Sequence, residues 1–496
     1  ENMGEVNTLL GRVLPTLVGA HYFGGWFRGP YSHWTWPTPG GPAWIDNHTF
    51  SGRVPLLGNY TTDRATIVAE LALADTALDF FDVLWYDPAI AGTRPECAAA
   101  TDDPNLKSCL NTALAHMLSN DSTWPPTPSP RLHFYITYSN DADRSPRSQA
   151  HRMFCGPAGL AKWDSFSSTW LQAMRHPRYL RINGRPVFKI LIPLNYFTWQ
   201  CGGNATLAVM LIDRLRARCE SAGLGELLVG GGWLSPGRPN VAATATTKSR
   251  EEEARHHLAG TPDLPRDGYV RWNATAIECC TAKIIPNASI VECAAACNAS
   301  ATCAAFTSTE GGAAACELKN SSSPGVGCVG ATTYVKVAPP PPYPYDFGGT
   351  YNAAIPVCPA THPTGPCARF KTIGSVVNYS YAAAWQNAVR VANHTGDRVP
   401  YLPNVIAGFD PRPWHEATAG LSDATDAEWR DALRVAKVQV ESGDAALGFP
   451  HANGPSGVQP AFSIYAWNEY GEGGILAPTV GDGTAKVDAV RAIFGR

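Results

Sequence analysis

Two acidic side chains lie three residues apart near the end of the sequence, in the stretch YAWNEYGEGG at residues 465–474. In a helical turn, this spacing would place the carboxylates of Glu469 and Glu472 on one face. Carboxylates that close repel each other, so we expect one to keep its proton to a higher pH than the other. An acid paired with a base or nucleophile is what hydrolysis of a glycosidic bond requires.

The alternative for this pair is that both glutamates are solvated acids in a glycine-rich surface loop, as most such pairs are. The neighbours argue against it, because Trp467, Tyr470 and several glycines surround the two acids. Apolar surroundings are costly to maintain around charges that have no function. We therefore interpret Glu469 and Glu472 as candidate catalytic residues.

The elements that must position this pair are short apolar runs alternating with helical stretches, a pattern typical of βα units. Strands are predicted at residues 16–23, 78–86, 132–138, 187–193, 227–233, 349–355, 401–409 and 462–467. Helices are predicted at residues 63–76, 105–118, 157–174, 205–222, 381–393, 424–440 and 484–494. Eight such strands predict an α/β fold, a (β/α)8 TIM barrel with its active site at the C-terminal ends of the strands.

Further residues at the predicted strand ends suit a sugar-binding cleft, because aromatic rings stack on pyranose rings and polar groups bind hydroxyls. The candidates are His21, Tyr22, Trp85, Tyr86, Asp87, Asp410, Arg412, Trp414, Trp467, Asn468 and Tyr470. Other roles stay open: Trp85 and Tyr86 could belong to the core, and Asn468 could simply cap the turn. Arg412 could instead lower the pKa of a catalytic carboxylate. Lys189 is either a buried partner or a residue of the barrel mouth.

Composition argues against nucleic acid and membrane partners. The formal net charge is -3 and only 16% of the 496 residues are charged, so no basic surface is expected. The longest apolar run, residues 187–194, is interrupted by Lys189 and Pro193 and is far shorter than the roughly 20 residues of a membrane helix. An oligosaccharide or polysaccharide is the expected partner, with no nucleic acid and no membrane span.

Cysteines and glycosylation motifs both predict a secreted, extracellular protein. Glycosylation acceptors are expected at Asn47, Asn59, Asn120, Asn204, Asn273, Asn287, Asn298, Asn320, Asn378 and Asn393. Among 14 cysteines, pairs close in sequence are Cys97/Cys109, Cys201/Cys219 and Cys358/Cys367. Since no CxxC pair and no zinc-like Cys/His spacing occur, neither a metal nor an organic cofactor is expected. The absence of an apolar leader at Glu1 fits a removed signal peptide.

The composition changes between residues 234 and 342, where seven cysteines lie within fifty residues and a run of prolines follows at residues 339–342. We expect a linker and a disulfide-rich insert at residues 234–342, with the barrel formed by residues 1–233 and 343–496. The segment VECAAACNASATCAAFTSTEGGAAACELKNSSSPGVGC resembles PAN/apple domains. That resemblance implies pairs Cys293–Cys316 and Cys297–Cys303, and Cys328 with Cys279 or Cys280. The remaining member of this doublet would then pair with Cys155.

The acidic pair itself carries a family resemblance. WNEYGEGGILAPT resembles the terminal signature of glycoside hydrolase family 99, the endo-α-1,2-mannosidases, and of related WbsX-type proteins, and it is similar to a stretch of family 71 α-1,3-glucanases. RVPLLGNYTTDRATIVAELALADTALDFFDVLWYD, HPRYLRINGRPVFKILIP and VIAGFDPRPW resemble the second, fourth and seventh strand regions of the family. The resemblance implies that Glu469 acts as a base on the sugar 2-hydroxyl and Glu472 as the general acid/base, with retention of configuration.

A different class of function is also compatible with these features. A secreted barrel with an apple-like insert could be a non-catalytic carbohydrate-binding or matrix scaffold glycoprotein, with a protein or glycan partner bound through the insert. Both acids, Glu469 and Glu472, are retained, and this favours hydrolysis because a binding groove has no need for two adjacent carboxylates. The sequence therefore predicts an endo-acting α-glycosidase that cleaves a mannoside or glucoside.

Overall fold

The computed structural model divides the chain into two compact units, one comprising Glu1–Leu234 with Pro344–Arg496 and the other Ser235–Tyr343. The structure describes residues 14–27, 33–35, 43–46, 48–57, 61–91, 101–119, 123–124, 131–140, 152–193, 196–231, 269–273, 281–286, 305–309, 315–319, 331–336, 345–349, 399–410, 412–414, 424–442, 446–452, 454 and 457–496. Among these residues, no helix has the length and apolar character needed to cross a membrane.

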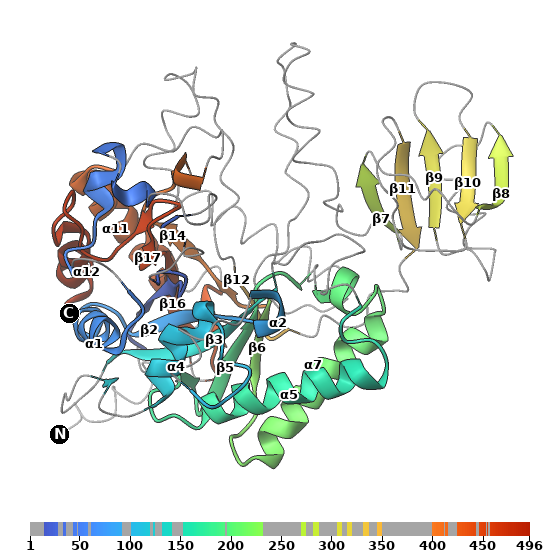
Figure 1. Cartoon of the computed structure of the whole chain (residues 1–496), viewed down its shortest axis with the longest axis horizontal. Coiled ribbons are helices and arrows are strands. Elements are labelled where there is room, and N and C mark those ends of the chain that lie inside the picture. Colours follow the sequence, from blue (N-terminus) through green and yellow to red (C-terminus); the bar gives the residue numbers. More distant parts are fainter. Residues whose placement is uncertain are drawn as a thin grey trace, which may run out of the picture. The chain divides into compact units, whose positions relative to one another are not determined.

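A parallel sheet forms the centre of the first unit (Figure 1). Its strands are β1 (Leu17–Tyr22), β2 (Phe80–Tyr86), β3 (His133–Ser139), β5 (Arg185–Ile190), β6 (Leu228–Gly231), β12 (Phe347–Gly349), β13 (Tyr401–Leu402), β14 (Asn404–Ile406) and β16 (Val458–Tyr465). They follow the order β13-β12-β6-β5-β3-β2-β1-β16-β14, and each neighbouring pair is parallel. Two short strands, β4 (Arg181–Ile182) and β15 (Gly448–Pro450), add antiparallel pairs to β5 and β16.

The two ends of this strand order come from one stretch of chain, because only Pro403 separates β13 from β14. Proline has no backbone N–H, so the ladder is interrupted there. The nine strands are therefore nearly closed into a barrel. Of the predicted sixth strand, residues 349–355, the structure describes only Gly349, which ends β12.

Helices follow several of these strands along the chain (Figure 1). They are α1 (Arg64–Ala74), α4 (Thr112–Ser119), α5 (Gly156–Met174), α7 (Ala205–Ser221), α11 (Asp426–Ser442) and α12 (Ala485–Phe494). Shorter helical segments are η2 (Trp44–Asp46), η3 (His48–Arg53), α2 (Pro88–Ala91), η4 (Cys109–Asn111), η6 (Tyr196–Gln200) and η7 (Arg412–Trp414). The predicted helix at residues 381–393 lies outside the described residues, so complete strand–helix alternation stays a prediction.

Local chemistry fixes several helix ends where the sequence predicts them. Asp63 caps α1 by accepting a hydrogen bond from the Thr66 backbone N–H. Asn204 caps α7 in the same way through Leu207, and Gly223 follows α7 in a left-handed conformation. Short polar side chains satisfy the first free N–H groups of a helix, and glycine ends it without a steric penalty.

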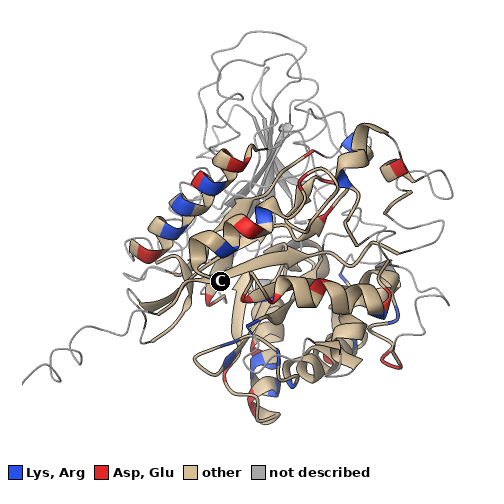
Figure 2. Ribbon diagram, turned by 90° about the vertical axis from the view of Figure 1, so that its left-hand side faces the viewer, with Lys and Arg blue, Asp and Glu red and all other residues tan. Residues whose placement is uncertain are grey.

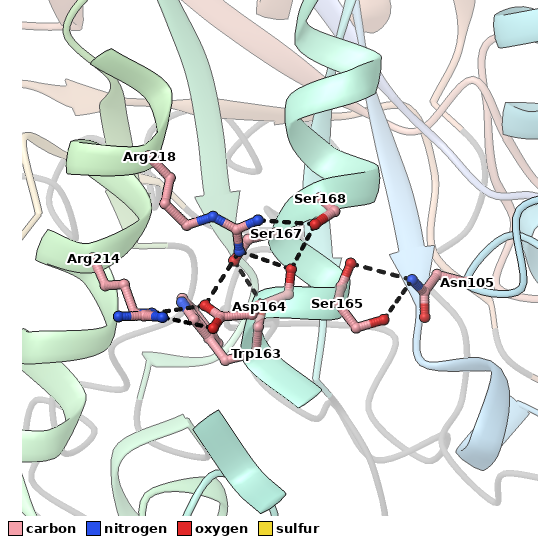
Figure 3. A network of polar contacts seen from close by, with 8 residues as sticks. All are labelled: Asn105, Trp163, Asp164, Ser165, Ser167, Ser168, Arg214 and Arg218. Carbon is pink, nitrogen blue, oxygen red and sulfur yellow. Dashed lines mark hydrogen bonds and ion pairs between the residues drawn. The ribbon is translucent and has the colours of Figure 1, made fainter. Parts of the chain in front are cut away.

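The outer surfaces of the helices are joined by charged pairs. Arg214 and Arg218 of α7 both bind the carboxylate of Asp164 on α5, at 2.6 and 3.2 Å (Figure 3). Basic and acidic residues are interspersed along the helices that Figure 2 shows. On α11, for example, Arg430 pairs with Asp426 at 2.8 Å. Such exposed pairs contribute little stability each, but they place both signs of charge on the helix surfaces.

The second unit contains an antiparallel sheet with the strand order β7-β11-β9-β10-β8. These strands are β7 (Tyr269–Asn273), β8 (Thr281–Pro286), β9 (Ala305–Thr309), β10 (Ala315–Lys319) and β11 (Ala331–Lys336). Apart from Cys316 on β10, its cysteines lie outside the described residues. The resemblance to PAN/apple domains and the pairs that it implies among these cysteines therefore stay predictions. The predicted pair of Cys155 with one member of the Cys279/Cys280 doublet is not formed, because Cys155 is a free thiol.

One predicted disulfide is wrong. Cys201 and Cys219 are both free thiols and both buried. Cys201 precedes α7 and Cys219 lies in its last turns, so most of a helix that rises about 1.5 Å per residue separates them. A disulfide needs Cα atoms within roughly 7 Å. Spacing in the sequence suggested proximity, but the helix holds the two thiols apart.

The other predicted pairs of the first unit are not decided by the structure. Cys109 is disulfide-bonded, but its predicted partner Cys97 lies outside the described residues. Cys358 and Cys367 also lie outside them. Of the ten glycosylation acceptors, the structure describes Asn204, which is exposed, and Asn273, which ends β7. The remaining acceptors lie outside the described part, and glycosylation stays a prediction.

Candidate active site

A tight hairpin carries the two candidate catalytic acids. It consists of β17 (Asn468–Glu469) and β18 (Gly474–Ile475), which pair antiparallel. The backbone N–H of Glu472 donates to the carbonyl of Glu469 at 3.2 Å, closing the turn. The segment is therefore a hairpin and not the helical turn considered from the sequence. Because β16 is parallel to β1 and β14 and ends at Tyr465, the hairpin lies at the C-terminal ends of the barrel strands.

The two carboxylates have different surroundings. Glu469 is buried, with 3% of its surface exposed, whereas Glu472 is partly exposed. The hydroxyl of Tyr465, the last residue of β16, donates a short hydrogen bond to the Glu472 carboxylate. The Tyr465 ring is itself fully buried and lies 6.4 Å from the ring of His21. Neither acid is a freely solvated surface residue, as the alternative interpretation would require.

An arginine-bound carboxylate supports the hairpin from the side of β14. The backbone N–H of Asp410 donates to the carbonyl of Glu472 at 2.5 Å. Arg412 binds the Asp410 carboxylate with two nitrogens, both at 2.7 Å, and Arg53 binds it at 2.6 Å. Arg53 also donates to the carbonyl of Tyr470 at 3.0 Å. The Asp410–arginine cluster thus holds both the turn and the loop that precedes η7.

This cluster settles one role that the sequence left open. Burial raises the pKa of Asp410, but the hydrogen bonds from Arg412 and the charge of Arg53 outweigh burial and hold that pKa below its ordinary value. Arg412 therefore does lower the pKa of a carboxylate, but the affected group is Asp410. A sugar contact by Asp410, Arg412 or Trp414 stays a prediction; Arg412 and Trp414 begin and end η7.

Aromatic side chains enclose the other side of the hairpin. Tyr470 is buried, stacks on Trp34 with ring centroids 5.5 Å apart and meets the edge of Trp26 at 5.3 Å. The side-chain amide of Asn468 accepts from the backbone N–H of Phe23 at 2.8 Å and donates to its carbonyl at 2.9 Å. Asn468 therefore joins the hairpin to the loop after β1, and Tyr470 fills the aromatic cluster.

Two predicted sugar-contacting residues instead face helix α1. The Tyr22 hydroxyl donates to one oxygen of Glu70 at 2.6 Å, and the Trp467 indole N–H donates to the other at 2.8 Å. Both aromatic residues are fully buried, and Glu70 is 1% exposed. The prediction for Tyr22 and Trp467 is corrected to a packing role, because both buried side chains point toward α1 and bind Glu70.

The predicted sugar-contacting residues at the end of β2 and just after it are corrected in a similar way. Trp85 is fully buried and packs against Phe166 of α5 with ring centroids 4.8 Å apart, so the core alternative holds. Asp87 accepts from the backbone N–H of Ala89 at 2.9 Å and pairs with Lys162 at 2.7 Å. It thereby fixes the start of α2. Tyr86 is partly buried and ends the strand.

A buried charged network that the sequence analysis did not identify occupies the interior of the sheet. Asp82 of β2 pairs with Lys189 of β5 through a short contact and with the ring of His21 at 2.9 Å. The hydroxyl of Tyr135 also donates to Asp82 at 2.8 Å. All of these side chains are fully buried, and the strand register places His21, Asp82 and Tyr135 side by side. Lys189 is thus the buried partner, and His21 belongs to this network.

The network shifts the pKa values of its ionisable groups. Burial would raise the pKa of Asp82, but the charges of Lys189 and His21 more than offset it, so this pKa lies well below its ordinary value. Burial lowers the pKa of Lys189 despite the opposing effect of Asp82. The available signal was Asp82 itself, an acid in the middle of the apolar strand FFDVLWY, which is rarely tolerated without a partner.

Among the residues that the structure describes, no group of three or more His, Cys, Asp or Glu side chains could hold a metal ion. No protein-family model matches the sequence, and no curated protein matches it. Among solved structures, the chain is similar to a protein named "Glycoside hydrolase-like protein", with a TM-score of 0.47 and 12% sequence identity over 98% of this chain and 95% of that one.

Proposed function

We propose that this chain is a secreted glycoside hydrolase that cleaves an α-linked mannoside or glucoside within an oligosaccharide or polysaccharide. The observation that carries the proposal is the hairpin after β16. It holds Glu469 and Glu472 in unequal surroundings at the C-terminal ends of the strands, where barrel enzymes have their active sites. The sequons and cysteines support secretion, and the resemblance to family 99 supports the class of substrate.

For an α-mannoside, in which the 2-oxygen lies trans to the departing oxygen, the proposed reaction proceeds in two steps. In the first, Glu472 gives its proton to the departing glycosidic oxygen while Glu469 removes the proton of the sugar 2-hydroxyl. The 2-oxygen then bonds to the anomeric carbon, forming an anhydro sugar. In the second step, Glu472 removes a proton from water, the water oxygen attacks that carbon, and Glu469 returns its proton to the 2-oxygen. Two inversions give net retention of configuration.

Tyr465 has a defined part in this proposal. Its hydroxyl donates to Glu472, so it stabilises the carboxylate that Glu472 becomes after protonating the leaving group. Asp410, Arg53 and Asn468 act as positioning residues, because their hydrogen bonds fix the backbone of the hairpin. The hairpin thus reaches the substrate already held in place.

Replacing the two acids separately tests the proposal. We expect Glu472→Gln to lower kcat on a natural glycan by about 10³-fold, within the range for loss of a general acid, while glycan binding persists. An aryl glycoside with a good leaving group needs no protonation, so it should rescue the first step in Glu472→Gln but not in Glu469→Gln. Glu220→Gln, an exposed site on α7, is the control. Full activity in Glu472→Gln would refute the assignment.

The same assay distinguishes the non-catalytic alternative. A chain that binds glycans but does not cleave natural polysaccharides or activated aryl glycosides would be a carbohydrate-binding or scaffold protein. The insert would then supply its protein or glycan contact, as the resemblance to apple domains suggests. Detectable turnover of a natural glycan that both glutamine variants lower strongly, with the control variant unchanged, would exclude this alternative.

A further inference from the structure

Two free thiols lie on backbone segments that contact each other directly. Cys155 immediately precedes α5, and Cys201 immediately follows η6. The backbone N–H of Phe154 donates to the carbonyl of Gln200 at 3.1 Å. Phe154 and Gln200 are the residues just before the two cysteines. A second backbone bond, from Arg152 to the carbonyl of Trp199 at 2.5 Å, aligns the segments.

Side-chain positions agree with this alignment. The Sγ atom of Cys155 lies 3.4 Å from the position that a Cβ would take on Gly202, the neighbour of Cys201. Cys155 is the N-cap residue of α5, and its side chain makes no capping hydrogen bond. Cys155 is partly exposed, whereas Cys201 is fully buried. The thiol of Cys155 is therefore both reachable from solvent and directed toward the Cys201 segment.

The surroundings of Cys201 make its thiol difficult to ionise and separate it from Cys219. Burial raises the pKa of the Cys201 thiol, contact with Tyr196 partly offsets this, and the nearby thiol of Cys155 raises it further. The length of α7 separates Cys201 from Cys219, as described above. A thiol that is difficult to ionise is also a slow nucleophile, so the first attack on an oxidant falls to the more exposed Cys155.

We propose that Cys155 and Cys201 form a disulfide in an oxidising compartment, joining the start of α5 to the segment between η6 and α7. The Cys155 thiolate attacks a small disulfide such as oxidised glutathione, forming a mixed disulfide and releasing one thiol. The Cys201 thiolate then attacks Cys155 Sγ and releases the second thiol. Two protein thiols are oxidised and one disulfide of the oxidant is reduced.

The bond would join the chain segments that follow β3 and β5, at the same end of the barrel as the candidate catalytic hairpin. It would close a loop of more than forty residues, and such loops lose considerable entropy in the unfolded chain when cross-linked. The inference does not depend on the proposed enzymatic activity, because it rests on the two thiols and their backbone contacts alone.

Peptide mapping without reduction tests the proposal. The intact chain is first oxidised in a glutathione redox buffer, and its free thiols are then alkylated in denaturant. An endoglycosidase removes any glycan at Asn204, a predicted acceptor, before digestion with trypsin. The three cysteines under test then lie in separate peptides: Cys155 in Met153–Lys162, Cys201 in Ile190–Arg214, and Cys219 in the peptide that begins after Arg218. We expect the first two peptides to be linked and Cys219 to be alkylated. Alkylation of both Cys155 and Cys201, or either in another pair, would overturn the proposal.

Thermal unfolding supplies a second measurement. Either reduction or the substitution Cys155→Ala should lower Tm by on the order of 5 °C, because each removes the bond. Reduction of the Cys155→Ala variant should therefore lower its Tm less than reduction lowers the Tm of the unmodified chain. Cys219→Ala is the matched control: it removes a buried thiol but should keep the full response to reductant. Equal responses of Cys155→Ala and the unmodified chain to reductant would count against the bond.

Discussion

Asp82 is an acidic residue inside the barrel, on the apolar strand β2. It is fully buried, and its charge is compensated by Lys189, His21 and the hydroxyl of Tyr135. Buried ion pairs contribute little compared with apolar residues, but removal of one partner leaves a charge without compensation. The network therefore makes the fold sensitive to substitutions at positions far from the hairpin.

Lys189→Met tests this sensitivity. We expect the free energy of unfolding to fall by about 3–5 kcal/mol, because Asp82 loses its closest cation in an environment without water contact. Urea unfolding measures the change. Arg430→Met, which removes an exposed pair on α11, should change stability by less than about 1 kcal/mol. If the two variants lost equal stability, Asp82 would not need Lys189.

His33 makes the free energy of unfolding depend on pH. Burial lowers its pKa from 6.5 to about 4, although a hydrogen bond with the Gly25 backbone acts in the opposite direction. Between these values the unfolded chain binds a proton that the folded chain does not, so stability falls as pH drops through this window. The contribution is about 3 kcal/mol at most.

His33→Phe should flatten that dependence. Unfolding free energies measured from pH 4 to pH 7 should decline less on acidification than those of the unmodified chain, because phenylalanine cannot bind the proton. His48→Gln, at an exposed position on η3, should leave the slope unchanged. Parallel profiles for His33→Phe and the unmodified chain would contradict the assignment.

At the residue scale, the sequence located the acidic pair but not the orientation of its neighbours. The spacing and aromatic context of Glu469 and Glu472 pointed to the hairpin. The sequence could not show which way Tyr22 and Trp467 face, because fully buried strands are apolar on both sides. Their shared partner Glu70 comes from α1, and such a contact depends on tertiary packing that no local pattern encodes.

At the scale of elements, the hairpin depends on a close approach between β18 and the end of β16. A Cβ on Gly474 would lie 2.6 Å from the ring of Tyr465 and 3.2 Å from the backbone nitrogen of Ala466. Only a residue without a side chain fits there. The same ring carries the hydroxyl that binds Glu472, so hairpin packing and the candidate acid are linked.

Gly474→Ala should therefore reduce activity more than stability. The added methyl group displaces the Tyr465 ring, and we expect kcat to fall by about 10-fold or more, as misplacement of a catalytic group does. Turnover of a natural glycan measures the effect. Gly52→Ala is the control, because its added Cβ would meet only Gly481 at 3.7 Å. Full activity of Gly474→Ala would show that the Tyr465 position does not matter.

The ends of helices agree with the prediction where a single nearby residue determines them. Asp63 and Asn204 cap helices that begin close to the predicted starts at residues 63 and 205, and Gly223 follows α7. The hairpin was less accessible, because an acid pair at a spacing of three fits a helical turn equally well. Its left-handed Gly473, with φ of 76°, favours a tight turn, but a glycine alone does not identify one.

At the scale of the whole molecule, the C-terminal residue binds the start of the barrel. Arg496, which follows α12, contacts both oxygens of Asp79 and donates to the carbonyl of Thr16 at 3.0 Å. Asp79 also accepts from the backbone N–H of Val18 at 2.7 Å. Arg496 therefore joins the segments that lead into β1 and β2.

Arg496→Ala should destabilise the first unit. We expect a loss of about 1–3 kcal/mol, since Asp79 keeps its burial but loses charge-assisted hydrogen bonds. Chemical unfolding followed by tryptophan fluorescence measures it. Arg434→Ala, whose partner Asp431 is exposed, should have little effect. A loss in Arg496→Ala no larger than that of Arg434→Ala would mean that the C-terminal contact is dispensable.

The interruption at Pro403 gives the barrel a seam. Among the described residues, β13 pairs with β12 over two residue pairs and β14 with β16 over three, whereas β2 and β3 pair from Phe80 through Tyr86. Amide protons along the seam should exchange with solvent sooner than those between β2 and β3. If the barrel opens transiently, we expect it to open at these short strand pairs. Separation of β14 from β16 would then expose the edge of β16, the strand that leads to the acidic hairpin.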